Sequence, residues 1–84
     1  MVYEVTLKPS AQRDLDALPD REVERISRRL IQLGLDPRPI GVQKLTAEEG
    51  YRIRIGNYRV LFMIDDKQRK VFIYRIKHRK DIYR

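Results

Sequence analysis

The C-terminal half of the chain carries a hydrophobic period of two residues. Residues 51–55 read Tyr-Arg-Ile-Arg-Ile, so apolar and arginine side chains alternate. This alternation is typical of a β-strand that buries one face. Gly56 and Asn57 follow, and a glycine in the first of two loop positions favours a type II′ hairpin turn. The pattern therefore predicts an antiparallel hairpin centred on this turn.

The turn also fixes the register of the hairpin. If Ile55 faces Tyr58, every further pair is determined, and directly paired residues point to the same side of a sheet. One face is then wholly apolar or aromatic, with Tyr51, Ile53, Ile55, Tyr58, Val60, Phe62 and Ile64. The opposite face, which we call the arginine face, carries Arg52, Arg54 and Arg59 beside Leu61 and Met63.

The arginine face places like charges directly across from each other. Arg54 faces Arg59, and such a pair destabilises a sheet. We interpret the cluster as an anion site, because the planar guanidinium group binds phosphate through two hydrogen bonds and keeps its charge at any working pH. The alternative is that the arginines spread into water, or pair with Glu48 and Glu49 before the strand.

Helical spacing replaces the two-residue period in the N-terminal half. After a first strand at Val2–Leu7, apolar residues recur three or four positions apart between residues 11 and 18, which predicts a helix with Ser10 as its N-cap. A second helix follows Pro19–Asp20, and Gly34 stands where a left-handed C-terminal residue belongs. Both apolar stripes are narrow, so this helical hairpin needs a sheet to pack on.

Residues 70–77 predict a last strand that is apolar on both faces, as a central strand is. This pattern leaves the facing of the strand open, but placing Phe72, Tyr74 and Ile76 inward sends Arg75 and Lys77 to the arginine face and avoids burying a cation. The predicted fold is a single α+β domain over residues 1–84. It has an N-terminal strand, a helical hairpin and a three-stranded antiparallel meander, with the helices on one face of a mostly antiparallel sheet.

The net charge of +7 is distributed unevenly. Residues 1–50 hold eight Lys/Arg and nine Asp/Glu, whereas residues 51–84 hold eleven Lys/Arg and three Asp/Glu. A positive excess confined to one half of the chain is the pattern of a polyanion binder, and nucleic acid is the commonest polyanion in cytoplasm. Charge alone is equally compatible with a solvated surface, so the geometry of the arginine face carries the interpretation.

Other features of the composition exclude several kinds of site. The chain has no cysteine, and its one histidine is His78, which excludes disulfides, thiolate metal sites and zinc sites with several histidines. The N-terminus lacks a basic region followed by an apolar run, and no apolar stretch is long enough to cross a bilayer. We therefore expect a cytoplasmic protein without contact to a membrane and without a cofactor.

The combination of elements resembles the RelE/ParE superfamily of toxin–antitoxin toxins over nearly the whole chain. The resemblance includes Lys44–Leu45 before a turn, the run Y-R-I-R-I-G-N-Y-R-V at residues 51–60, and the ending H-R-K-D-I-Y at residues 78–83. Both branches of the superfamily share the middle run. The ending is similar to that of the RelE branch of ribosome-dependent mRNA endonucleases, while the ParE branch, which acts on DNA gyrase, usually lacks that tyrosine.

The resemblance implies a mechanism and a set of roles. Such toxins enter the ribosomal A site, where the ribose 2′-hydroxyl of the mRNA attacks the adjacent phosphate. Arg52 and Arg54 match the basic pair of the family, and Arg59 matches its phosphate-stabilising arginine. Arg79 and Tyr83 match the C-terminal basic residue and the tyrosine that stacks on or orients a nucleotide. We expect further RNA contacts from Arg75, Lys77, Lys80 and Lys44.

One departure from the family concerns proton transfer. The basic pair is often lysine in RelE-type toxins, and arginine is a poor general base. Imidazole titrates near neutral pH, so His78 is the candidate for proton transfer, with a plain surface histidine as the alternative. Tyr83 has an alternative role as a packing anchor for the tail.

The resemblance also implies partners, namely the ribosome with its mRNA and a cognate antitoxin. The antitoxin would contribute an acidic or amphipathic segment that covers the arginine face or displaces the tail. Two other functions remain open from the sequence. One is a ParE-like inhibitor of DNA gyrase, and the other is a basic RNA-binding module without catalysis, which would place no demand on His78 or Tyr83.

Overall fold

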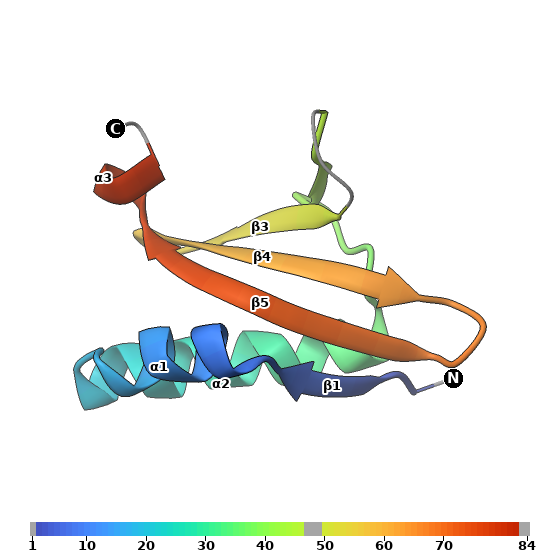
Figure 1. Ribbon diagram of the computed structural model, residues 1–84, viewed down its shortest axis with the longest axis horizontal. Coiled ribbons are helices and arrows are strands. Elements are labelled where there is room, and N and C mark those ends of the chain that lie inside the picture. Colours follow the sequence, from blue (N-terminus) through green and yellow to red (C-terminus); the bar gives the residue numbers. More distant parts are fainter. Residues whose placement is uncertain (1, 47–49, 83–84) are drawn as a thin grey trace.

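The structure, a computed structural model, describes residues 2–46 and 50–82. Within them, five strands form one sheet in the order β1-β5-β4-β3-β2, and two helices lie against one of its faces (Figure 1). Only β1 and β5 run parallel. The predicted α+β fold is therefore confirmed. The elements in chain order are β1 (Glu4–Leu7), α1 (Pro9–Asp16), α2 (Asp20–Leu35), β2 (Gln43–Lys44), β3 (Tyr51–Ile55), β4 (Tyr58–Asp65), β5 (Lys70–His78) and α3 (Arg79–Ile82).

The β3–β4 hairpin has the predicted register. Ile55 pairs with Tyr58, and Arg54 pairs with Arg59. Gly56 has a φ of 60°, while φ is not positive at Asn57, as a type II′ turn requires. The arginine face thus lies on the side of the sheet away from α1 and α2.

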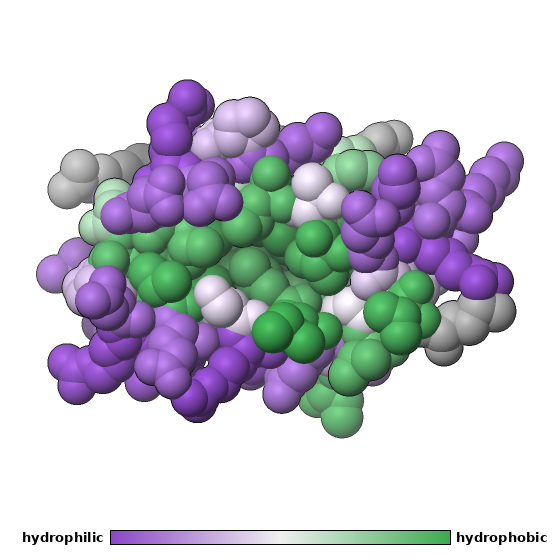
Figure 2. Space-filling model, turned by 90° about the horizontal axis from the view of Figure 1, so that it is seen from below, coloured by the Kyte–Doolittle hydropathy of each residue, from purple (hydrophilic) through white to green (hydrophobic). Residues whose placement is uncertain are grey.

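The core lies between the sheet and the two helices. Ile53, Val60 and Phe62 from the hairpin are at most 2% exposed and pack against Ile26 and Leu33 of α2 and the remaining buried residues. Seen from the helix side, apolar atoms form a broad central patch surrounded by hydrophilic side chains (Figure 2). Ile31 and Leu35 of α2 keep 69% and 65% of their surfaces exposed. An apolar area therefore remains uncovered on the side opposite the arginine face.

The facing predicted for the last strand is wrong in its first half. Val71 and Ile73 are fully buried, so Phe72 points to the other side of the sheet. The register then shifts, because Phe62 pairs with Ile73 while Leu61 pairs with Arg75. This β-bulge inserts one extra residue, Tyr74, and restores Ile76 to the core. Arg75 and Lys77 reach the arginine side as predicted, and β5 is an interior strand.

Helix α1 covers the edge of β5 beyond the end of β1. Ser10 Oγ donates a hydrogen bond to the carbonyl of Tyr74 at 2.6 Å, and the N–H of Ile76 donates to Asp14 Oδ2 at 2.8 Å. Ser10 is therefore not the N-cap that we predicted. The helix instead begins at Pro9, whose fixed φ suits the first helical position.

Asp14 also forms an ion pair with Arg75, with 2.9 Å between Oδ2 and Nε. Partial burial acts to raise the pKa of Asp14, but the hydrogen bonds from Arg75 and the Ile76 N–H outweigh it and hold the pKa below its ordinary value of 3.8. The same pair raises the pKa of Arg75. A carboxylate with a lowered pKa in the folded state stabilises the fold above pH 3.8, and this stabilisation is lost as the pH falls through the folded pKa.

We therefore expect Asp14→Asn to destabilise the protein by roughly 1 kcal/mol at pH 6, since the amide oxygen still accepts from Ile76 but loses the ionic contribution. The difference from the unaltered protein should narrow as the pH falls from 5 to 3. Urea unfolding across this range measures it, with Asp16→Asn on the same helix as the control. A difference that stays constant with pH would contradict the assignment.

Gly34 lies inside α2 and does not adopt the left-handed conformation that we predicted. Its carbonyl accepts the N–H of Tyr3 at 2.7 Å, and a Cβ added to Gly34 would lie 2.9 Å from the carbonyl oxygen of Tyr3. Glycine is needed here because the helix and the start of the chain approach each other too closely for a side chain.

Gly34→Ala should therefore lower the free energy of unfolding by about 1–2 kcal/mol, although alanine alone would favour the helix by about 1 kcal/mol. Thermal or urea unfolding provides the measurement. Gln32→Ala, at an exposed position of the same helix, should change stability by less than about 0.5 kcal/mol. A stabilised Gly34→Ala variant would show that the contact relaxes at no cost.

Candidate functional site

Three cations lie in a row across the arginine face. Arg54 on β3 pairs with Arg59 on β4, which pairs in turn with Lys77 on β5. Neighbouring strands are about 4.8 Å apart, so the three side chains start within about 10 Å of one another. Arg52 lies two residues from Arg54 on the same face of β3 and adds a fourth cation.

The guanidinium groups on β3 are held through their Nε atoms. Arg52 Nε donates to Gln43 Oε1 at 2.9 Å, and Arg54 Nε donates to the carbonyl of Gly56 at 3.2 Å. In Arg59 the Nε is buried from solvent. Because Nε is already engaged on β3, Arg52 and Arg54 present their two terminal nitrogens, an arrangement suited to a bidentate phosphate contact. The three arginines line one depression together with Gly41 and Gln43.

Gln43 is a site residue that the sequence reasoning missed. It pairs with Arg52 across β2 and β3, so its side chain lies on the arginine face. The two-residue strand β2 has no period that could have revealed it. In hindsight, a polar residue directly before Lys44–Leu45 was the only signal.

Arg38 anchors the loop that leads to Gln43. Its two terminal nitrogens donate to the carboxylate of Asp66 at 3.1 and 2.9 Å, and its guanidinium lies 5.2 Å from the ring centre of Tyr51. Tyr3 also donates to Asp66, at 2.7 Å. The hydrogen bond from Arg38, followed by that from Tyr3, lowers the pKa of Asp66 to about 2. Four segments of the chain therefore meet at one ion pair that fixes the course of this loop.

Two of the predicted RNA contacts are placed differently. Lys44 pairs with Tyr51, so it points to the helix side of the sheet at the far edge. Arg75 starts on the arginine side opposite Leu61, but its guanidinium pairs with Asp14 at the β5 edge. Neither residue joins the row formed by Arg54, Arg59 and Lys77.

His78 lies on the opposite side of the sheet from the arginines. It pairs with Tyr58, whose ring it meets edge-on at 5.2 Å between centroids. The backbone N–H of Lys80 donates to its Nδ1 at 3.2 Å. The structure therefore does not bring His78 together with Arg52, Arg54 and Arg59, because a one-residue step along β5 reverses the facing.

The tail helix α3 stands on the side of the sheet away from α1 and α2, beside the arginine face (Figure 1). Its first residue is anchored to the hairpin turn, because the N–H of Arg79 donates to the carbonyl of Asn57 at 2.8 Å. Arg79 and Lys80 are both exposed on this helix. Tyr83 lies outside the described residues. The start of the tail is thus held at the hairpin turn, two residues from Arg59.

The profile of the family described as "ParE toxin of type II toxin-antitoxin system, parDE" matches residues 5–83. The chain belongs to this toxin family. It is also similar to Toxin RelG of Mycobacterium tuberculosis, with 36% identity over 86 residues that cover 100% of this chain and 99% of the relative. The resemblance to RelE/ParE toxins is thereby confirmed, and the protein is a toxin of a toxin–antitoxin module.

Solved structures of toxin–antitoxin complexes share the fold of this toxin. The RelBE2 complex of Mycobacterium tuberculosis matches with a TM-score of 0.84 and 32% identity, covering 93% of this chain and 99% of that chain. The archaeal RelE–RelB complex of Pyrococcus horikoshii OT3 matches with a TM-score of 0.80 and 26% identity, covering 94% and 97%. Both support the RelE-like branch.

In the part of the chain that the structure describes, the toxin shows neither a metal-binding cluster nor a membrane-spanning helix. Among residues 2–46 and 50–82, no three His, Asp or Glu side chains gather as ligands for a metal ion. In the same part of the chain, no helix has the length and apolar character needed to span a membrane.

Proposed function

We propose that this toxin is a ribosome-dependent endoribonuclease that cleaves mRNA in the A site. The observation that carries the proposal is the row formed by Arg54, Arg59 and Lys77, with Arg52 beside it, on one open face of the sheet. A row of cations suits a phosphate group that gains negative charge during the reaction, and the engaged Nε atoms of Arg52 and Arg54 leave their terminal nitrogens facing such a group. The relatives named RelG and RelE support the same branch.

In the proposed reaction, the 2′-oxygen forms a bond to the adjacent phosphorus while the bond from phosphorus to the 5′-oxygen breaks. The products are a cyclic 2′,3′-phosphate and a free 5′-hydroxyl. Arg52 and Arg54 bind the phosphate oxygens, and Arg59 stabilises the charge of the pentacovalent transition state. Arg79 and Tyr83 keep the roles that the resemblance implies, as a phosphate contact and as the residue that stacks on or orients a nucleotide.

We assign proton transfer to Lys77 in place of His78. Lys77 pairs directly with Arg59 on the arginine face, while His78 faces the other side. Unlike guanidinium, an ammonium group can release its proton and take it back. Lys77 is therefore the residue in this row with the chemistry to act as an acid or base toward the 2′-hydroxyl or the 5′-leaving oxygen.

The related structures also support a cognate antitoxin as partner, since they were solved as complexes of a toxin with its antitoxin. The uncovered apolar area on the helix side offers a surface for an amphipathic segment. The arginine face offers one for an acidic segment.

Inhibition of DNA gyrase is the second candidate function, because the matching family profile is that of ParE toxins. Mapping of mRNA 5′-ends after brief expression, with and without a block of translation, tests both candidates. We expect new 5′-ends within translated codons that disappear when translation is blocked. Intact mRNA together with DNA breaks or inhibited supercoiling would favour gyrase, and intact mRNA and DNA would leave an RNA-binding module.

A further inference from the structure

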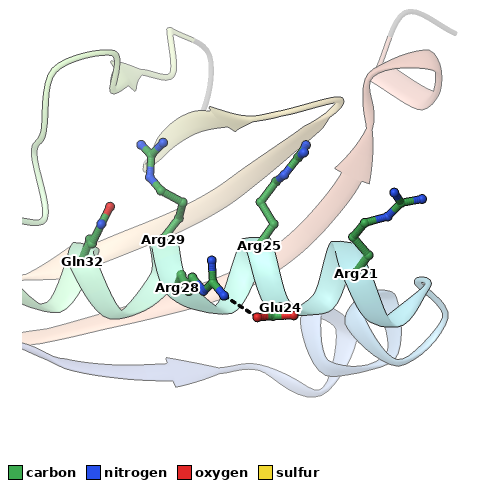
Figure 3. A pocket seen from close by; sticks show the side chains of 6 residues that line it. All are labelled: Arg21, Glu24, Arg25, Arg28, Arg29 and Gln32. Carbon is green, nitrogen blue, oxygen red and sulfur yellow. Dashed lines mark hydrogen bonds and ion pairs between the residues drawn. The ribbon is translucent and has the colours of Figure 1, made fainter.

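Helix α2 carries a second row of arginines outside the arginine face. Arg21, Arg25 and Arg29 recur every four residues, and all three extend from the helix toward the hairpin side of the molecule (Figure 3). Each step of four residues advances about 6 Å along a helix, so the row spans about 12 Å. We call these three residues the α2 ridge. A surface hollow runs beside it, lined also by Glu24, Arg28 and Gln32.

Most of the charge of the α2 ridge is not neutralised by acidic neighbours. Within the described part of the chain, Arg21 and Arg29 have no hydrogen-bond or ion-pair partner, and Arg25 has only Glu22, at 4.0 Å. Glu24 pairs with Arg28, which is not part of the ridge (Figure 3). Two or three arginines are therefore available to an anionic partner.

The α2 ridge is continuous with the arginine face through the hairpin turn. The guanidinium of Arg25 lies against Gly56, since a Cβ added there would be 2.5 Å from Arg25 Nη1. On the other side of the same residue, Arg54 Nε donates to the Gly56 carbonyl. A band of positive charge thus passes from the sheet, around the β3 edge, to the helix.

The composition of the ridge favours nucleic acid over a polypeptide. None of the large exposed apolar side chains of the described residues lines the hollow. Protein interfaces usually have apolar or aromatic anchors at their centre, whereas a groove of arginines without such anchors suits a phosphate backbone. A length of 12 Å spans several successive phosphates.

We propose that the α2 ridge binds the phosphate backbone of a folded RNA, outside the strand that is cut. This inference rests on the proposed function, under which the folded RNA is ribosomal RNA. The ridge then contributes to docking and leaves the chemical step to the arginine face. Removing ridge charge weakens binding to ribosomes and leaves cleavage at saturating ribosome concentration unchanged.

The test uses the full-length toxin and the double variant Arg21→Gln/Arg29→Gln. The matched control is Arg13→Gln/Lys67→Gln, which removes two exposed charges from α1 and the β4–β5 turn. Glutamine is a good helix former, and equal thermal unfolding of the variants verifies the fold. The probes are purified 70S ribosomes carrying a short mRNA and a 20-base-pair RNA duplex.

We expect the ridge variant to bind ribosomes on the order of tenfold more weakly, and the logarithmic salt dependence of its binding to flatten by about 1.4–1.8. The control should stay within about threefold. The proposal is overturned if the ridge variant and the control variant bind ribosomes equally well. It is also overturned if the ridge variant loses affinity for the antitoxin alone, because the ridge would then be a protein interface. A third result separates this proposal from the proposed function. If the ridge variant binds both the ribosomes and the RNA duplex more weakly, but the unaltered toxin cuts no mRNA, the ridge is an RNA-binding surface and the proposed function fails.

Discussion

Replacing Arg59 by glutamine should slow single-turnover cleavage of ribosome-bound mRNA by about 10²–10³-fold. Arg59 is central in the row, with Arg54 on one side and Lys77 on the other. Solvent screens the charge of this guanidinium less than that of a fully exposed one, because its Nε is buried, and Arg52 and Arg54 line the same depression. Rapid-quench measurement of the cleaved mRNA at saturating ribosome concentration provides the rate.

Two further variants separate catalysis from folding and from simple charge. Arg59→Lys keeps the charge but loses the planar fork, so its rate should fall between those of the glutamine variant and the unaltered toxin. Arg13→Gln removes one exposed charge on α1 and should leave the rate within about twofold. Cleavage by a folded Arg59→Gln variant at the rate of the control would remove Arg59 from transition-state stabilisation.

Replacing Lys77 by glutamine should slow cleavage by about 10²-fold or more, while His78→Gln stays within about threefold. The reason is the facing of β5, since Lys77 pairs with Arg59 and His78 pairs with Tyr58 on the other side. The same rapid-quench assay compares the two variants, which change neighbouring residues of one strand.

Lys77→Arg distinguishes proton transfer from charge stabilisation. Arginine keeps the positive charge but does not release a proton under working conditions, so this variant should remain slow and its rate should depend differently on pH. A Lys77→Arg variant as fast as the unaltered toxin would limit Lys77 to electrostatics. A severe loss in His78→Gln would return proton transfer to the histidine.

The sequence was most informative where a short turn fixed the geometry. Gly56–Asn57 leaves one register for the hairpin, and the strict alternation of β3 then places Arg52 and Arg54 opposite the core. No long-range information was needed, because every pair in the hairpin follows from the turn. The arginine face was therefore predictable residue by residue.

Features that depend on contacts distant in the sequence were not predictable in this way. The bulge at Tyr74 reverses the facing of β5 midway along the strand. The sequence did not reveal it, because apolar residues occur at both odd and even positions of this strand. Gly34 looked like a helix end because nothing local reveals that Tyr3 lies against it. The facing of His78 follows from the pairing of β4 with β5, whereas its choice for proton transfer rested on the pKa range of imidazole and not on its position in the sheet.

The sheet has two unequal edges, and this difference bears on solubility. Near β5, α1 closes the edge by hydrogen-bonding the backbone of Tyr74 and Ile76. On the other side, β2 pairs only with Tyr51 and Arg52, so within the described residues the rest of β3 is an unprotected edge. Exposed edges invite a strand from another molecule, and a charged side chain such as Arg54 discourages this aggregation. Under the proposed function, an apolar replacement of Arg54 would therefore have two effects, because it would remove a phosphate contact and also make the toxin prone to self-association.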